Sequence, residues 1–81
     1  MKKILTVYTI DNCHSCDHVK NYLRSHDLEF NEVRVNEEDE ALREELVQRS
    51  GRRGFPQEFA GALALDTKQK IESYVKLVKG E

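Results

Sequence analysis

The stretch Thr6-Val7-Tyr8-Thr9 leads, three residues later, into Cys13-His14-Ser15-Cys16, and this junction decides the fold of the chain. Its first part is rich in β-branched and aromatic residues and predicts a strand over residues 3–10. The second part opens a segment whose apolar residues have helical spacing, predicted to run from about residue 13 to residue 25. We expect Asp11 or Asn12 to cap this helix. The only two cysteines of the chain therefore fall in the first turn of a helix that follows a strand.

A cysteine in the first turn of a helix faces unpaired backbone N–H groups and the positive end of the helix dipole. Both favour the thiolate, which is the reactive form of the side chain. Cys16 lies three residues after Cys13 on the same helical face and can close a disulfide with it. The pattern indicates dithiol–disulfide exchange, in which Cys13 attacks a substrate disulfide and Cys16 then attacks the mixed disulfide.

Length, composition and charge limit the other possibilities. The 81 residues make one domain, residues 1–81, with one modest core. The net charge is −2 and the basic residues are scattered among 15 acidic ones, so we expect no nucleic-acid-binding surface. The first apolar run is short and interrupted, which argues against an export signal or a membrane span. We therefore expect a cytoplasmic protein, and in that compartment a CxxC pair is usually redox-active or metal-binding.

The rest of the chain alternates strand and helix patterns. Residues 28–35 predict a second strand, and the acidic residues 38–40 mark the start of a second helix that ends at Gly51. Phe55-Pro56 opens a third strand that runs to about residue 60, and residues 62–65 form a fourth. Asp66, with Gln69 three residues later, predicts the start of the last helix. The order β-α-β-α-β-β-α predicts an α/β fold with a four-stranded mixed sheet flanked by three helices.

This order of elements, together with the strand that leads into Cys13-His14-Ser15-Cys16, resembles the glutaredoxins and glutaredoxin-like redoxins of the thioredoxin superfamily. The resemblance covers nearly the whole chain, and Lys20 lies where glutaredoxins often carry a lysine. Gly54-Phe55-Pro56-Gln57 is similar to the Thr-Val-Pro-Gln segment of that family. The resemblance implies a thioredoxin-like fold and a small thiol-disulfide oxidoreductase whose catalytic residues are Cys13 and Cys16. It also implies that Pro56 follows a cis peptide bond and faces the cysteines, and that Phe55 presents its backbone to an incoming thiol.

The chain departs from the family pattern at several positions. His14 and Ser15 replace the usual proline and tyrosine, and Ile10 stands where a lysine or arginine usually precedes the first cysteine. The segment Leu63-Ala64-Leu65-Asp66-Thr67 occupies the region in which glutaredoxins carry a Gly-Gly pair that lines the glutathione site. These departures weaken the case for efficient glutathione binding and leave the dithiol chemistry intact.

Five further residues are candidates for binding a substrate or thiol. Arg53, like Arg52, could bind the carboxylates of glutathione or an acidic partner surface. Gln57 and Thr67 flank the expected groove, and His14, when protonated, could place a positive charge beside Cys13.

Glu58 stands where an apolar strand residue is usual. Burial of an unpaired carboxylate is costly, so we expect its side chain to reach the edge of the sheet or a basic group such as Arg52, Arg53 or a lysine.

Two electron sources are compatible with this chemistry. Glutathione would make the protein a true glutaredoxin, whereas a thioredoxin-reductase-type flavoenzyme would make it a redoxin like those that serve ribonucleotide reductase. We expect a monomer with no bound cofactor, acting on disulfide-containing proteins or glutathione mixed disulfides.

Two other functions remain open at this point. Small copper chaperones also carry CxxC after a first strand, but their βαββαβ fold requires a hairpin where residues 38–50 predict a helix. No second Cys/His pair is spaced to complete a zinc site, so we expect no metal. The other possibility is a non-catalytic interaction domain that has kept the motif.

Overall fold

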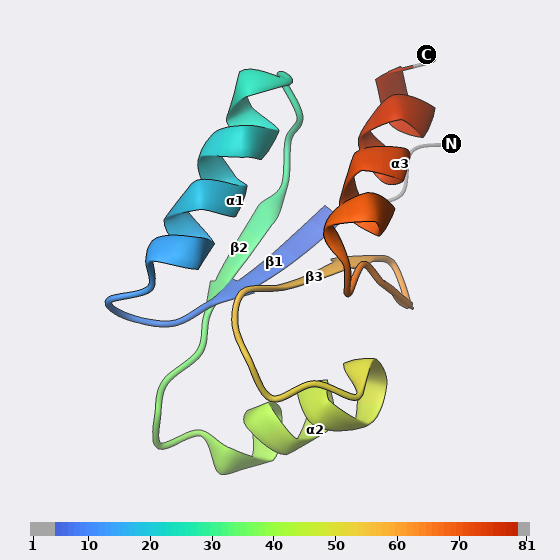
Figure 1. The fold of residues 1–81 in the computed structure, drawn as a ribbon. Coiled ribbons are helices and arrows are strands. Elements are labelled where there is room, and N and C mark those ends of the chain that lie inside the picture. Colours follow the sequence, from blue (N-terminus) through green and yellow to red (C-terminus); the bar gives the residue numbers. More distant parts are fainter. Residues whose placement is uncertain (1–4, 80–81) are drawn as a thin grey trace.

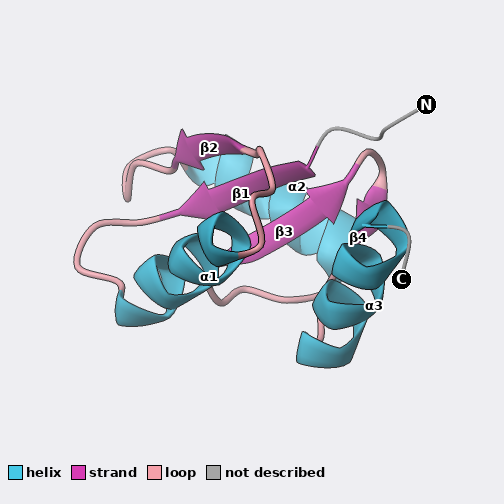
Figure 2. Cartoon of the chain, turned by 90° about the horizontal axis from the view of Figure 1, so that it is seen from above, coloured by secondary structure: helices cyan, strands magenta, loops and turns pink. Residues whose placement is uncertain are grey.

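The computed structural model describes residues 5–79, which form a four-stranded sheet with helices on both faces (Figures 1 and 2). Helices α1 and α3 cover one face and α2 covers the other. The strands lie in the order β2-β1-β3-β4, with β1 parallel to β2 and the other two pairs antiparallel. The predicted mixed sheet flanked by three helices is confirmed. The strands are β1 Leu5–Thr9, β2 Asn31–Arg34, β3 Gln57–Ala60 and β4 Leu63–Ala64.

The strands are shorter than the sequence pattern predicts. Residues 28–30 precede β2 as a loop, although Leu28 and Phe30 still pack against the core on the α1 side. The predicted first strand included Lys3 and Ile4, which lie outside the described residues. Apolar alternation therefore marks which side chains are buried more reliably than it marks where backbone pairing begins.

The first helix, α1 (His14–Ser25), begins one step later than the predicted cap. Cys13 itself is the N-cap, with φ −117° and ψ 102°, and its side chain accepts a hydrogen bond from the amide of Cys16. Asn12 instead adopts a left-handed conformation, with φ 55°, so the prediction that Asp11 or Asn12 caps the helix is wrong. An asparagine is one of the residues that tolerates this conformation best, and it turns the chain from β1 into the helix.

The second helix, α2 (Glu40–Ser50), has the ends that the sequence predicts. Asp39 caps it by accepting a hydrogen bond of 3.1 Å from the amide of Leu42. Gly51 closes it in a left-handed conformation, with φ 76°, and donates its amide to the carbonyl of Val47.

The third helix, α3 (Lys68–Lys79), begins after Thr67. The Thr67 hydroxyl accepts a hydrogen bond of 3.1 Å from the amide of Lys70, so threonine supplies the cap that we predicted for Asp66. The Asp66 carboxylate instead forms a 2.8 Å ion pair with the Lys70 ammonium. Both contacts hold the first turn of α3.

Strand β1 contributes to a hydrophobic core on each face of the sheet. Its alternating side chains point to opposite sides, with Leu5 and Val7 toward α1 and α3, and Tyr8 toward α2. On the α2 side, the rings of Tyr8 and Phe59 meet edge to face, with centroids 5.6 Å apart. The buried residues are Leu5, Val7, Leu23, Ala60, Leu65 and Val75 on the first side, and Val35, Leu46 and Phe59 on the second.

The cap of α2 gives a direct test of this local structure. Asp39→Ala removes the acceptor for the Leu42 amide and should lower the free energy of unfolding by about 1 kcal/mol. Glu38→Ala removes the same charge one residue earlier without removing a cap, so it should cost much less. Urea unfolding of the two variants measures the difference, and equal losses would contradict the capping role.

Candidate active site

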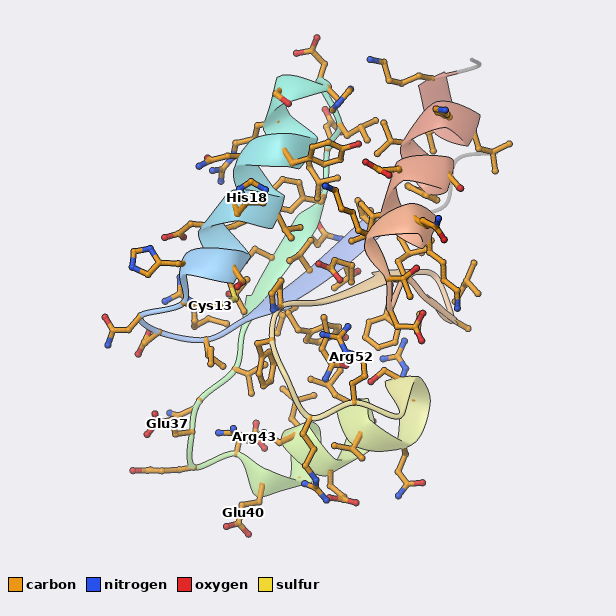
Figure 3. The ribbon with its side chains drawn as sticks, in the orientation of Figure 1. Cys13, His18, Glu37, Glu40, Arg43 and Arg52 are labelled. Atoms are coloured by element: carbon orange, nitrogen blue, oxygen red, sulfur yellow. A yellow bond between two sulfur atoms is a disulfide. The ribbon has the colours of Figure 1, made fainter. Side chains whose placement is uncertain are left out.

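The two cysteines lie at the N-terminal end of α1, where β1 delivers the chain to the helix. Figure 3 labels Cys13 at this end, with His18 further along the same helix. Cys13 and Cys16 form a disulfide, with their Cα atoms 5.3 Å apart. The Cys16 amide donates a hydrogen bond of 3.1 Å to the Cys13 sulfur. Cys13 is partly exposed and Cys16 is only 1% exposed, so an incoming substrate meets Cys13 first.

The charges around this turn are balanced in pairs. Asp11 precedes Cys13 and forms a 2.6 Å ion pair with Arg34 from β2. Asp17 follows in the first helical turn and lies 3.6 Å from the Lys20 ammonium. Each carboxylate that would oppose a thiolate thus has a cation beside it. The remaining influence is the helix N-terminus, which favours negative charge on the Cys13 sulfur in the reduced protein.

A polar network behind the turn ties α1 to β1 and β2. The buried Thr9 hydroxyl donates a hydrogen bond of 2.8 Å to a Glu32 carboxylate oxygen, and the same oxygen lies 3.0 Å from the Lys20 ammonium. These two hydrogen bonds, that from Thr9 being the stronger influence, hold the pKa of Glu32 below its usual value. Arg34 completes the network by donating from Nε to the Thr9 hydroxyl over 3.1 Å.

This network is not among the features that we predicted from the sequence, although the sequence carries one signal for it. In β1, Thr9 continues the alternation of Leu5 and Val7, which places a hydroxyl at a fully buried position. A buried hydroxyl needs partners, and the parallel neighbour β2 supplies them from Glu32 and Arg34.

The segment before β3 faces the cysteine-bearing turn as predicted. The Phe55–Pro56 peptide bond is cis. Pro56 is buried and lines a groove together with His14 and Ser15, so the proline and the CxxC turn share one wall. The side chain of Phe55 packs on the α2 side of the sheet, with the Arg43 guanidinium 5.7 Å from its ring centroid.

Three of the residues predicted to bind a substrate or thiol, Gln57, Arg53 and Thr67, have side chains that contact other parts of the protein. The Gln57 side chain is 1% exposed and donates hydrogen bonds to the carbonyls of Arg52 and Gly54, at 2.9 and 3.0 Å, so it braces the preceding loop. Arg53 points away and lies 3.8 Å from Glu44 of α2, and Arg52 lines the groove in its place.

Thr67 does line the groove, but its hydroxyl is engaged as the cap of α3. Sequence spacing located this region correctly, whereas the direction of each side chain depended on local backbone geometry.

The groove itself lies between α1 and α3 and has a volume of about 660 Å³. One end is formed by the CxxC turn and Pro56, and the sides combine apolar with charged and polar residues of the two helices, β3 and the segments before β3 and α3. These side residues include Val19, Tyr22, Leu65 and Ile71. A larger hollow of about 840 Å³ lies near the other end of α1, lined by Leu28, Phe30 and Tyr74 among others, and its lining does not include the CxxC turn.

Glu58 contributes a carboxyl group to this groove from the inner strand β3. Its side chain is buried, with the residue only 4% exposed, and no ion pair to it is found within residues 5–79. The expectation that it reaches the sheet edge or an ion-pair partner is therefore wrong. Burial raises the pKa of Glu58 to about 7, although the positive charge of Arg52 acts in the opposite direction. This carboxyl therefore keeps its proton to a higher pH than an exposed glutamate does.

Comparison with known proteins agrees with this geometry. A profile of the glutaredoxin family matches residues 5–62. A protein of Lactococcus lactis subsp. cremoris named glutaredoxin-like protein NrdH is 38% identical over 53 residues, which cover 65% of this chain and 71% of that protein. The chain belongs to the glutaredoxin family.

Solved structures show the same fold over almost the whole chain. The solution structure of a glutaredoxin from Brucella melitensis is 32% identical, with a TM-score of 0.72, and the match covers 96% of this chain and 87% of that one. The crystal structure of a buckwheat glutaredoxin–glutathione complex has a TM-score of 0.74 at 21% identity, covering 96% of this chain and 71% of that one. The fold is thioredoxin-like, and the chain is a thiol-disulfide oxidoreductase with a CxxC pair.

Residues 5–79 contain neither a metal-binding cluster nor a membrane-spanning helix. No group of three or more His, Cys, Asp or Glu side chains is placed to hold a metal ion in this part of the chain. None of its helices has the length and apolar character needed to cross a membrane.

The buried carboxyl predicts an unusual dependence of stability on pH. Because the pKa of Glu58 rises from 4.5 to about 7 on folding, the folded state binds more protons in this window and stability falls as pH rises through it. Glu58→Gln removes this titration, so its stability advantage over the wild type should be about 2 kcal/mol larger at pH 8 than at pH 5.

Urea unfolding at the two pH values measures this difference. Glu45→Gln, an equal charge change on the exposed face of α2, is the matched control and should show no such trend. An advantage of Glu58→Gln that does not change with pH would contradict the raised pKa.

Proposed function

We propose that this glutaredoxin-family enzyme reduces protein disulfides and receives its electrons from a thioredoxin-reductase-type flavoenzyme rather than from glutathione. The observation that carries the proposal is the segment before α3, residues 63–67. Leu65 is buried there, the Asp66 carboxylate is paired with Lys70, and the Thr67 hydroxyl caps α3. These side chains have structural partners where the family resemblance places a glutathione-lining Gly-Gly pair.

The loop before the cysteines supports the same choice of reductant. Ile10 replaces the lysine or arginine that the resemblance would place there, and its side chain packs into the core on the α2 side. Arg53, the other candidate for a glutathione carboxylate, lies outside the groove. A protein reductase recognises a broader surface and does not depend on these few contacts.

The chemical steps follow from the positions of the two sulfurs. The Cys13 thiolate attacks one sulfur of the substrate disulfide, which forms a mixed disulfide and releases the other substrate sulfur as a thiolate that takes up a proton. Cys16 then loses its proton and attacks the Cys13 sulfur, which releases the second substrate thiol. The substrate gains two electrons and the Cys13–Cys16 pair is left oxidised. The reduced dithiol of the flavoenzyme restores the pair by the same exchange in reverse.

The structure favours this enzyme over the copper-carrier alternative because α2 occupies the place where that fold requires a β-hairpin. A cytoplasmic location and a monomeric state also belong to the proposal. Both fit a small carrier that must meet a reductase and its substrates in turn.

A paired assay tests the electron source. With a disulfide-bonded protein as substrate, NADPH oxidation is measured with thioredoxin reductase, and separately with glutathione plus glutathione reductase. We expect turnover at least about tenfold faster in the first system at equal protein concentration. Cys13→Ser should show no turnover in either, and equal or faster turnover with glutathione would contradict the proposed reductant.

A further inference from the structure

The starting observation is a carboxyl group buried in the wall of a substrate-sized groove. Glu58 is 4% exposed and lines the groove together with apolar side chains such as Val19, Leu65 and Ile71. A carboxylate in such surroundings is stabilised either by taking up a proton or by a cation placed beside it. The protein therefore holds an acidic group whose charge is not neutralised by an ion pair of its own.

The charged side chains and histidines around the groove include no ion-pair partner of Glu58 among the described residues, although the positive charge of Arg52 acts on it. Six of them face the groove from three elements: His14 and His18 on α1, Arg52 in the loop before β3, and Asp66, Lys68 and Glu72 at the start of α3. Arg52 donates a hydrogen bond of 3.4 Å to the carbonyl of Asp66, and the Asp66 carboxylate is held by Lys70. Among the described residues, none of the cations of this set forms an ion pair with Glu58.

The groove adjoins the CxxC turn, because His14 and Ser15, the two residues between the cysteines, line it together with Pro56 and Glu58. A substrate joined through its sulfur to Cys13 is thereby placed with its neighbouring side chains beside the groove. Glu58 follows Pro56 by only two residues, so the two residues lie close together along the groove.

We propose that Glu58 makes this groove selective for protein or peptide disulfides that carry a positively charged side chain, lysine or arginine, next to the reacting cysteine. The inference rests on the proposed function, because the groove receives such a chain only if Cys13 attacks its disulfide. A cation that enters the groove replaces the proton on Glu58 and gains an ion pair in a partly dry environment, where such pairs are stronger than in water. A neutral side chain gains nothing there, and an acidic one is repelled.

Synthetic peptides test the selectivity. Each carries one cysteine in a mixed disulfide with 2-mercaptoethanol, flanked on both sides by lysine, glutamine or glutamate. The second-order rate constant is measured by stopped flow with fully reduced protein, so no reductase or glutathione takes part. Each value is divided by the rate constant of the same peptide with dithiothreitol, which removes the effect of the flanking charge on disulfide reactivity itself.

For the wild type at pH 8 we expect the normalised rate constant of the lysine peptide to exceed that of the glutamine peptide by about tenfold, with the glutamate peptide slowest. In Glu58→Gln the lysine-to-glutamine ratio should fall to near one. Glu45→Gln, the matched charge change on the exposed face of α2, should keep the wild-type ratio.

The pH dependence separates Glu58 from the other groups. As the pH falls from 8 to 6, protonation of Glu58 should reduce the preference of the wild type for lysine. His14 and His18 also line the groove, but both are retained in Glu58→Gln. The difference between the two proteins therefore isolates the carboxyl.

The outcomes distinguish this inference from the proposed function. If the wild type reduces bis(2-hydroxyethyl) disulfide but shows no preference for lysine, or if Glu58→Gln keeps the preference, the selectivity is overturned while the oxidoreductase function stands. If the reduced protein reacts with none of these disulfides, the proposed function itself fails.

Discussion

The hydrogen bond from the Cys16 amide to the Cys13 sulfur is the contact on which the chemistry of this molecule depends. It exists because Cys13 ends an extended segment and caps a helix at the same time, so its sulfur takes the place that a serine or aspartate oxygen takes in other helices. The left-handed turn at Asn12 and the strand before it bring the chain to that position. A sulfur at this position in the reduced protein is stabilised as a thiolate by the same N–H groups.

The rest of the fold protects that arrangement. The two carboxylates nearest to Cys13 in sequence, Asp11 and Asp17, are each held by a cation, so they oppose the thiolate less than free carboxylates would. Arg34 and Lys20 provide those cations and also meet at Glu32, which fastens α1 to the sheet. Cys16 is buried whereas Cys13 is partly exposed, so Cys13 is the more accessible of the two sulfurs.

Much of this could be predicted from the sequence, since its patterns indicated every element and the predicted cis peptide bond before Pro56 is present. What could not be predicted depends on backbone conformation at single residues. Cys13 is the cap instead of the predicted Asp11 or Asn12, because Asn12 adopts a positive φ, which no apolar pattern encodes. Gln57 turned inward to the carbonyls of its own loop, and Glu58 was buried although burial of a carboxyl is costly. Acidic side chains are usually absent from buried positions, because an unpaired carboxylate is costly to bury. A buried acidic residue such as Glu58 is therefore a candidate for a functional role.

The ionisation of Cys13 is the most direct test of the central claim. The rate of iodoacetamide alkylation of reduced Cys16→Ser, followed against pH, reports the pKa of the Cys13 thiol alone, and the same protein in concentrated urea supplies the unfolded reference. We predict a midpoint clearly below about 8.5, the value of an unperturbed cysteine, in the folded protein and a return to that value in urea. A midpoint at or above about 8.5 in the folded protein would contradict stabilisation of the thiolate by the helix N-terminus.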